Sequence, residues 1–368
     1  MTSPSIPARS VTDYVTLGRS GLRVSPFCLG TATFGEDQGW GATPAVSEQI
    51  LARYLERGGN FIDSANVYTH GHAEKIIGDY FARVGGRDRA VISTKFFGNL
   101  YARDPNGGGA GRKSLVAACE QSLRRLQTDY IDLYWMHMWD PYTPIEETLR
   151  AMDDLVRAGK VRYLGFSDTP AWKTAQAQTI AQLRGWSALA GLQVEYSLLE
   201  RTVETELVPM ARELGLGVTA WGPLKGGMLT GKYTRENAAT VKPDRGPLVT
   251  GNFNERGFAV VDALNAAART LGATPAGVAL AWLLARPGLT SLLVGARTLQ
   301  QLDANLDAAA VTLSADIVAQ LDAASEPPLN FVRHSEFVAG PCMHGGVSIN
   351  GVTPIVFPLS AGPDTKIW

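Results

Sequence analysis

The stretch IDLYWMHMWDPYTPIEETLRAMDDLVRAGKVRYLGFS, residues 131–167, contains a strand, a helix and a second strand in succession. Residues 131–137 and 161–167 are short apolar runs of strand length, whereas residues 145–157 have the longer period of an amphipathic helix. Two strands joined through a helix are typical of a parallel sheet with helices on its faces. This stretch therefore predicts a βαβ unit.

The same alternation continues in both directions along the chain. In residues 113–126, Leu115, Cys119 and Leu123 fall on one stripe, while Lys113 and Glu120 lie off it. Other helices predicted in this way include 44–57, 145–157, 170–183 and 203–214. The predicted strands are 26–29, 61–64, 90–95, 131–137, 161–167, 191–196, 218–221 and 292–295.

Strands that each lead into a helix indicate a single (β/α)8 TIM barrel. The alternative, a doubly wound sheet that binds a dinucleotide, usually has GxGxxG at its first strand–helix turn, and residues 30–35 lack the second glycine. Residues 15–17 and 22–24 flank turn residues 18–21 and predict an N-terminal β-hairpin. A long loop after strand 7, residues 224–257, is expected on the functional face.

Composition excludes several classes of protein. The chain has 368 residues, 45% of them hydrophobic and 19% charged, with a net charge of -1, so no basic surface for nucleic acid is expected. Cys28, Cys119 and Cys342 are too far apart for a disulfide framework. His70 and His72 have no third ligand nearby, so no metal is expected. No signal peptide or membrane span is visible, and we expect a cytoplasmic protein with no membrane partner.

Four polar residues lie at the carboxyl ends of adjacent predicted strands, where barrel enzymes build their active sites. Asp63 ends strand two and Tyr68 follows it, Lys95 ends strand three, and His137 ends strand four. These four side chains suit the reduction of a carbonyl group. A phenol can protonate the developing alkoxide, and a nearby ammonium lowers the phenol's pKa from about 10. Asp63 can hold Lys95 by an ion pair, and His137 can orient the carbonyl oxygen.

These residues lie in stretches that resemble the aldo-keto reductase family and, within it, the aryl-alcohol-dehydrogenase-like group. The matching stretches are GGNFIDSANVYTHGHAEKIIG (58–78), VISTK (91–95), SLRRLQTDYIDLYWMHMWD (122–140), VRYLGFSDTPAW (161–172), LQVEYSLLER (192–201), TAWGPLKGGMLTGKY (219–233) and VGARTLQQLDANL (294–306). They occur in the family's order, over about residues 14–324. The resemblance implies that Asp63, Tyr68, Lys95 and His137 form a catalytic tetrad, with Tyr68 as the proton donor.

The resemblance also implies NADPH (NADP+) as the cofactor, bound across the barrel mouth. Ser167, Asp168 and Gln193 match positions that hold the nicotinamide carboxamide, and Trp221 matches the aromatic side chain that stacks on the ring. The positions implied for the rest of the cofactor are Thr31, Gly222, Pro223, Leu224, Gly226, Lys232, Gly295, Arg297, Gln301 and Asn305.

Three residues in or beside the implied cofactor site depart from the family's usual residue. Asp168 stands in place of Asn, as in the aryl-alcohol-dehydrogenase-like group, and can accept a hydrogen bond but not donate one. Ala304 replaces a Glu at the adenosine end, and Gly222 replaces a Ser beside Trp221. Cofactor affinity and the choice between NADPH and NADH are therefore the properties that these departures affect.

We expect an enzyme that reduces an aldehyde or ketone, with aryl aldehydes as one substrate class. The alternatives are a pathway-specific sugar or polyketide ketoreductase and a non-enzymatic, cofactor-sensing subunit. Phe34, Trp40, Phe96 and Trp139 are candidates for the substrate pocket, since they lie in the loops that wall this fold. A homo-oligomer is left open.

The chain is expected to form one aldo-keto reductase domain over residues 1–368, with its barrel at about 14–325 and a C-terminal tail at 326–368. The last barrel helix, near 298–308, is followed by a predicted helix at 314–324 with Ser314 as its cap, packed antiparallel to its predecessor. The tail is rich in apolar residues and carries little charge. We expect it to fold over the barrel mouth or cover a partner subunit.

Overall fold

The computed structural model describes residues 10–243, 246–328, 330–332, 342–344, 346–353, 355–356, 362 and 366. The chain divides into two compact units, Met1–Glu326 and Pro327–Trp368. The first unit contains the helices and strands discussed below. In the second, Ile349 and Val352 form an antiparallel bridge.

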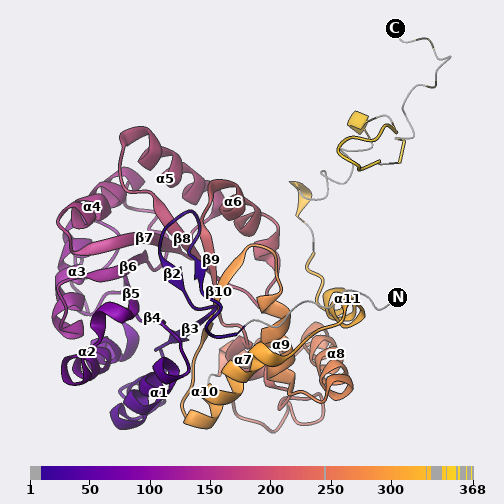
Figure 1. Ribbon diagram of the computed structural model, residues 1–368, viewed down its shortest axis with the longest axis horizontal. Helices are drawn as coiled ribbons and strands as arrows, with labels where there is room; N and C mark the ends of the chain where they lie inside the picture. The colour runs from indigo at the N-terminus through magenta and orange to yellow at the C-terminus, as the bar shows by residue number, and fades with distance from the viewer. Residues whose placement is uncertain are drawn as a thin grey trace. The chain divides into compact units, whose positions relative to one another are not determined.

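The first unit is a closed barrel of parallel strands, which confirms the predicted (β/α)8 TIM barrel (Figure 1). Neighbouring strands follow the order β10-β3-β4-β5-β6-β7-β8-β9 around the barrel. Their bounds are β3 (Phe27–Gly30), β4 (Phe61–Asp63), β5 (Val91–Phe96), β6 (Ile131–Met136), β7 (Val161–Ser167), β8 (Leu189–Glu195), β9 (Gly217–Trp221) and β10 (Leu289–Val294). Every predicted strand is present, with bounds that shift by up to three residues.

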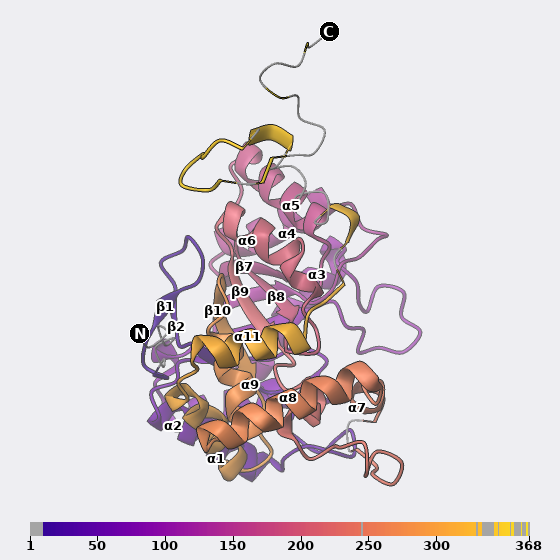
Figure 2. The same ribbon diagram turned by 90° about the vertical axis from the view of Figure 1, so that its right-hand side faces the viewer.

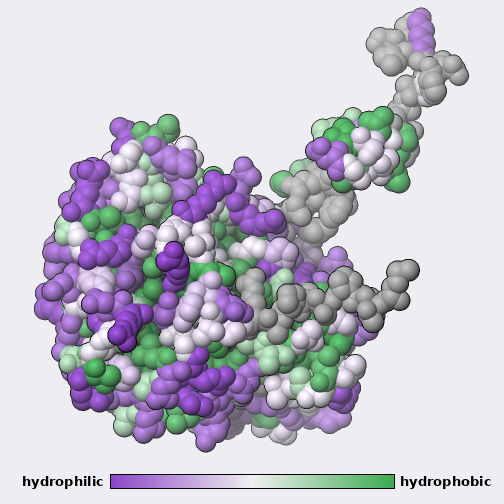
Figure 3. Space-filling view, in the orientation of Figure 1, coloured by the Kyte–Doolittle hydropathy of each residue, from purple (hydrophilic) through white to green (hydrophobic). Residues whose placement is uncertain are grey.

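Helices follow the strands and cover the outside of the barrel (Figure 1). Many hydrophilic residues, in purple, lie on their outer faces in Figure 3, as amphipathic helices require. The helices are α1 (Pro44–Glu56), α2 (His72–Val84), α3 (Arg112–Leu126), α4 (Ile145–Arg157), α5 (Ala171–Arg184), α6 (Leu207–Leu214), α7 (Pro247–Thr250), α8 (Glu255–Leu271), α9 (Pro275–Leu284), α10 (Leu299–Leu306) and α11 (Ala315–Ala324). None of the described helices has the length and hydropathy that a membrane span requires.

The predicted N-terminal hairpin is confirmed as β1 (Val15–Thr16) and β2 (Arg23–Val24), which pair antiparallel. It closes the barrel at the end opposite the carboxyl ends of the strands. Leu17 is fully buried in one apolar cluster with Phe61 and Leu133 of the barrel interior. The amide of Arg19 also donates to the carbonyl oxygen of Gly215, at a distance of 2.8 Å. The hairpin therefore leaves the carboxyl-end rim as the accessible mouth of the barrel.

The last helix, α11, begins as predicted, because the Ser314 side chain accepts a hydrogen bond from the amide of Ile317. Its packing partner differs from the prediction. α11 packs beside α8, as Figure 2 shows, rather than antiparallel to α10, because the short 3₁₀ helix Asp307–Ala310 redirects the chain.

The prediction that the tail covers the barrel mouth stays a prediction. Its residues Phe337, Phe357 and Trp368 lie outside the described residues.

Candidate active site

A cavity of about 540 Å³ opens at the carboxyl ends of the barrel strands. Its walls come from the ends of several strands and from the segments that follow β9 and β10. The lining residues that bear on the site are Trp40, Asp63, Tyr68, His137, Met138, Ser167, Asp168, Gln193, Glu195, Trp221, Gly222, Pro223, Leu224, Lys225, Gly226, Lys232, Gly295, Arg297, Gln301, Ala304 and Asn305.

Lys95 joins two of the other polar residues predicted for the site. It is fully buried at the end of β5, and its Nζ forms an ion pair with Asp63 of the neighbouring strand β4. The same nitrogen lies 2.8 Å from the carbonyl oxygen of Ser64 and 3.3 Å from the hydroxyl of Tyr68. The ring of His137 meets that of Tyr68 edge to face, with centroids 6.0 Å apart. The structure thus brings all four predicted side chains together.

Tyr68 owes its place to an unusual turn between β4 and α2. It begins the 3₁₀ helix Tyr68–Gly71, in which Thr69 and His70 have left-handed φ angles of 46° and 57°. Non-glycine residues are strained in this region and persist there only when their surroundings hold them. Thr69 is held by its hydroxyl, which donates to the carbonyl oxygen of Phe34 at 2.9 Å and accepts from the amide of Ala73 at 3.0 Å.

The electrostatics of Lys95 keep it positively charged. Burial alone would lower its pKa, but the attraction of Asp63 and Tyr68 and the hydrogen bonds to them outweigh burial and raise the pKa. Asp63 is itself held by the hydroxyl of Ser93, at 2.6 Å, and by Nε2 of Gln193, at 3.3 Å. The ammonium is therefore fixed beside the phenol.

The pKa of Tyr68 departs from the sequence-based expectation. Burial raises it above its usual value, and the opposing effect of Lys95 is smaller. The expectation considered the charge of Lys95 alone and not the loss of water around the hydroxyl. Tyr68 consequently keeps its proton at neutral pH, which is the form that a proton donor needs.

His137 is neutral over the physiological range. Burial and the nearby charge of Lys95 lower its pKa to about 3. A neutral imidazole can still donate one hydrogen bond to a carbonyl oxygen without competing with Tyr68 as an acid.

The residues expected at the nicotinamide line one wall of the cavity. The hydroxyl of Ser167 is buried and has no hydrogen-bond partner among the described residues. The indole Nε1 of Trp221 donates to Asp168, at 3.0 Å, which fixes the plane of the ring. A flat ring with an amide substituent would suit both features. Its amide would form a hydrogen bond with the buried hydroxyl of Ser167, and its face would stack on the fixed indole of Trp221.

The residues expected at the phosphates and the adenosine line the other end of the cavity. Gly222 has a φ of 65°, a left-handed conformation that other residues rarely adopt, so glycine suits this turn on the cavity wall. Lys232 and Arg297 supply positive charge on the cavity wall. Asn305 is buried, and its Nδ2 donates to the carbonyl oxygen of Gly295, at 3.3 Å. This end of the cavity therefore fits an anionic, extended ligand.

Comparison with known proteins identifies the family of this barrel. The model of the aldo/keto reductase family matches residues 26–326. The chain belongs to the aldo-keto reductase family. It is 40% identical over 320 residues to the uncharacterized oxidoreductase YrpG of Bacillus subtilis, covering 84% of this chain and 95% of that protein.

Two fungal proteins, one named as a reductase and one as a dehydrogenase, are also similar to this aldo-keto reductase. Norsolorinic acid reductase of Aspergillus flavus is 33% identical over 349 residues, which is 90% of this chain and 86% of that protein. Aryl-alcohol dehydrogenase GME11368 of Pestalotiopsis microspora is 33% identical over 339 residues, which is again 90% of this chain and 86% of that protein. Membership of the family makes the chain an oxidoreductase that reduces carbonyl groups with a nicotinamide cofactor.

Some residues predicted for the site lie elsewhere in the aldo-keto reductase. Thr31 is fully buried and donates to the carbonyl oxygen of Asp63, at 3.0 Å, rather than lining the cavity. Phe34 and Phe96 are fully buried in the hydrophobic core. Of the four aromatic residues predicted for the substrate pocket, Trp40 lines the cavity, whereas Trp139 packs against Trp172 on the rim.

The structure also adds two charged residues to the cavity wall. Lys225 donates to Glu195, at 2.6 Å, and the pair ties the start of the segment after β9 to the end of β8. Neither residue is conspicuous in the sequence, because their significance depends on a pairing between positions 30 residues apart. The register of β8 and β9, which pairs Glu195 with Trp221, is the signal that would have placed Glu195 beside this segment.

Proposed function

We propose that this aldo-keto reductase is an NADPH-dependent enzyme that reduces an aldehyde or ketone to an alcohol, with aryl aldehydes among its substrates. The observation that carries the proposal is the contact of Lys95 with both Asp63 and Tyr68 at the floor of the cavity. NADPH, when bound, supplies a hydride to the carbonyl carbon.

The residues of the chain would supply the proton and the orientation of the substrate. Tyr68, which keeps its proton at neutral pH, donates it to the carbonyl oxygen. Lys95 stabilises the phenolate that remains, and Asp63 holds Lys95 in place. His137, being neutral, donates a hydrogen bond that orients the carbonyl oxygen toward Tyr68.

The proposed cofactor residues are the ones that line the cavity. Ser167, Asp168 and Gln193 would bind the carboxamide, and Trp221 would stack on the ring. Lys232 and Arg297 would bind the phosphates.

Replacing Tyr68 tests the proposed proton donor. In Tyr68→Phe, kcat with 4-nitrobenzaldehyde should fall by about 100-fold or more, because general-acid catalysis typically contributes that much. NADPH binding, measured by fluorescence titration, should stay nearly unchanged. A variant with near-normal turnover would exclude Tyr68 as the donor.

A second candidate function is the reduction of a ketone in one biosynthetic pathway. It is supported by the similarity to a protein named for norsolorinic acid. A carbonyl screen that includes norsolorinic acid beside simple aryl aldehydes distinguishes the two candidates. A protein that binds NADPH yet reduces nothing in that screen would instead be a cofactor-sensing subunit.

A further inference from the structure

Two aromatic side chains, the exposed Trp172 and the half-buried Trp139, lie on the barrel rim just beyond the cavity. Trp139 follows the end of β6, and Trp172 lies in the first turn of α5. Their rings meet edge to face with centroids 5.6 Å apart, and Trp172 is 59% exposed. We call Met138, Trp139, Trp172 and Lys173 the aromatic ledge. Large apolar side chains grouped at the surface usually mark a binding site.

The aromatic ledge is continuous with the cavity. Met138 lines the cavity, is 47% exposed, and precedes Trp139 directly. Asp168, also on the cavity wall, lies four residues before Trp172. The ledge therefore extends the cavity over β6 and β7.

The position of the aromatic ledge is opposite the proposed adenosine end of the cofactor. Gly295 and Arg297 follow β10, and in the order of strands β10 lies across the barrel from β6. A cofactor that reaches from β10 past Trp221 to Ser167 at the end of β7 would leave the β6 side open. A substrate that approaches the nicotinamide from that side passes over the ledge.

The loop that carries Trp139 is held in place by its neighbour Asp140. The carboxylate of Asp140 accepts hydrogen bonds from the amides of Ala110 and Tyr142, both at 2.9 Å, and from the hydroxyl of Thr143, at 2.7 Å. These hydrogen bonds fix the loop before a ligand arrives, which lowers the entropic cost of binding.

Lys173 gives the aromatic ledge a positive charge. Its Nζ lies 4.5 Å from the ring centroid of Trp172 and 5.9 Å from that of Trp139. Its hydrogen-bond partner in the described part of the chain is neutral, Oε1 of Gln176 at 2.8 Å. An ammonium with a neutral partner beside two indoles suits an aromatic ring that carries an acidic group.

We propose that the aromatic ledge is a subsite for the outer ring of an extended aryl carbonyl substrate, favouring a ring with a carboxylate or phenolate substituent. The ring that bears the carbonyl would enter the cavity toward Tyr68, and the outer ring would pack on Trp139 and Trp172. This inference rests on the proposed carbonyl reductase function and names the substrate class that the site prefers.

Three aldehydes test the subsite: benzaldehyde, biphenyl-4-carbaldehyde and 4′-formylbiphenyl-4-carboxylate. In Trp172→Ala, kcat/KM for both biphenyl aldehydes should fall about fivefold, as expected for one aromatic contact, while benzaldehyde stays within about twofold. In Lys173→Met, the loss should be confined to the carboxylate. Leu183→Ala is the matched control, because Leu183 is 81% exposed near the other end of the same helix.

Equal losses for one-ring and two-ring aldehydes in Trp172→Ala, or no loss for either, would overturn the subsite. A change in native mass of Trp172→Ala without any dependence on substrate length would show that the ledge is a contact between two copies of the chain, and would also overturn it. Both outcomes are measured on the full-length chain by steady-state kinetics and light scattering.

A binding measurement separates the subsite from the proposed function. Calorimetric titration of the NADP+-saturated protein with biphenyl-4-carboxylate, which cannot be reduced, should show binding that Trp172→Ala and Lys173→Met each weaken by about fivefold. If the wild type reduces no aldehyde but this pattern holds, the proposed function fails and the subsite stands. If the aldehydes are reduced and the pattern is missing, the subsite alone fails.

Discussion

At the scale of single residues, Asp168 is a carboxylate next to the proposed nicotinamide position. Burial by the surrounding protein raises its pKa to about 6, with a further contribution from the charge of Glu195, and the hydrogen bond from Trp221 opposes the shift. Above pH 6 the side chain is therefore ionised, and below pH 6 it is protonated. An ionised carboxylate stabilises a positively charged nicotinamide more than a neutral one.

The ratio of NADP+ to NADPH affinity should consequently rise by about fivefold between pH 5 and pH 8, with its midpoint near 6. The Asp168→Asn variant should show a flat ratio over this range. Taking the ratio removes the titration of the cofactor's own phosphate, which is common to both forms. A slope that persists in the variant would assign the titration to another group. Fluorescence titration at several pH values measures both affinities.

Arg297 tests the choice between NADPH and NADH. It lines the cavity, and its amide donates to the side chain of Gln301, at 2.8 Å, at the start of α10. A guanidinium at this place would form a charge-assisted bond with the 2′-phosphate of NADPH, which NADH lacks. Arg297→Ala should weaken NADPH binding by about 1.5–3 kcal/mol and leave NADH binding almost unchanged. Equal losses for both cofactors would show that Arg297 does not contact the phosphate.

The sequence predicts strand-end residues better than loop residues, and Phe96 shows why. Successive side chains of a strand point to opposite faces. Lys95 points into the barrel, so its neighbour Phe96 must point out to the helices, where its ring packs 5.0 Å from that of Tyr134. Strand alternation could therefore have excluded Phe96 from the pocket, whereas no such rule places Trp40 or Trp139.

At the scale of elements, periodicity predicts the amphipathic helices and fails where a helix is buried on all sides. α9 has the sequence PAGVALAWLL, and eight of its ten residues are buried, so no polar face marks its period. α6 begins at Leu207 rather than at the predicted position 203. The later start puts Pro209 in the first turn, where its missing N–H costs no helical hydrogen bond.

The hairpin that closes the barrel depends on a turn that tolerates only glycine. Gly18 has a φ of 58°, and a Cβ there would lie 2.4 Å from the carbonyl oxygen of Gly215. Gly18→Ala should lower the free energy of unfolding by about 2–4 kcal/mol, through backbone strain and this clash. Gly21→Ala in the same turn is the control, because its Cβ would approach nothing closer than the Tyr163 hydroxyl at 4.0 Å. Urea denaturation measures the stability of both variants, and equal unfolding midpoints would show that the turn does not require glycine at position 18.

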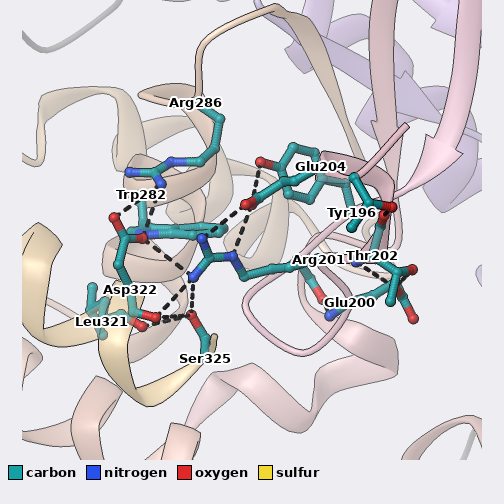
Figure 4. Close-up of polar contacts among 12 residues, drawn as sticks. Tyr196, Glu200, Arg201, Thr202, Glu204, Trp282, Arg286, Leu321, Asp322 and Ser325 are labelled. Carbon is teal, nitrogen blue, oxygen red and sulfur yellow. Dashed lines mark hydrogen bonds and ion pairs between the residues drawn. The ribbon is translucent and has the colours of Figure 1, made fainter. Parts of the chain in front are cut away.

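At the scale of the whole molecule, the last helix is joined to the barrel by a network around Arg201, which Figure 4 shows. Arg201 lies in the loop after β8 and is only 7% exposed. Its guanidinium donates to Glu204, at 2.8 and 2.9 Å, and to Ser325 at the end of α11, at 2.9 Å. Trp282 of α9 lies between the guanidinium groups of Arg201 and Arg286, whose carbons are 5.2 and 4.4 Å from its ring centroid. One side chain thus connects the barrel rim with α9 and α11.

Removing this guanidinium should loosen α11 specifically. Arg201→Met keeps an unbranched apolar stem but leaves Glu204 without its ion-pair partner, and we expect a loss of about 2–3 kcal/mol in the free energy of unfolding. Amide exchange should increase in residues 315–324 more than in α1 to α4, because the hydrogen bonds and ion pairs of Arg201 among the described residues involve α11 and none of those four helices. Arg235→Met is the matched control: Arg235 also pairs with a glutamate, Glu255, but both side chains are exposed to solvent, so its removal should change stability little. If the two variants lose the same stability, or if exchange rises uniformly over the barrel, the Arg201 network contributes no more than an exposed ion pair, and α11 is held by its packing against α8.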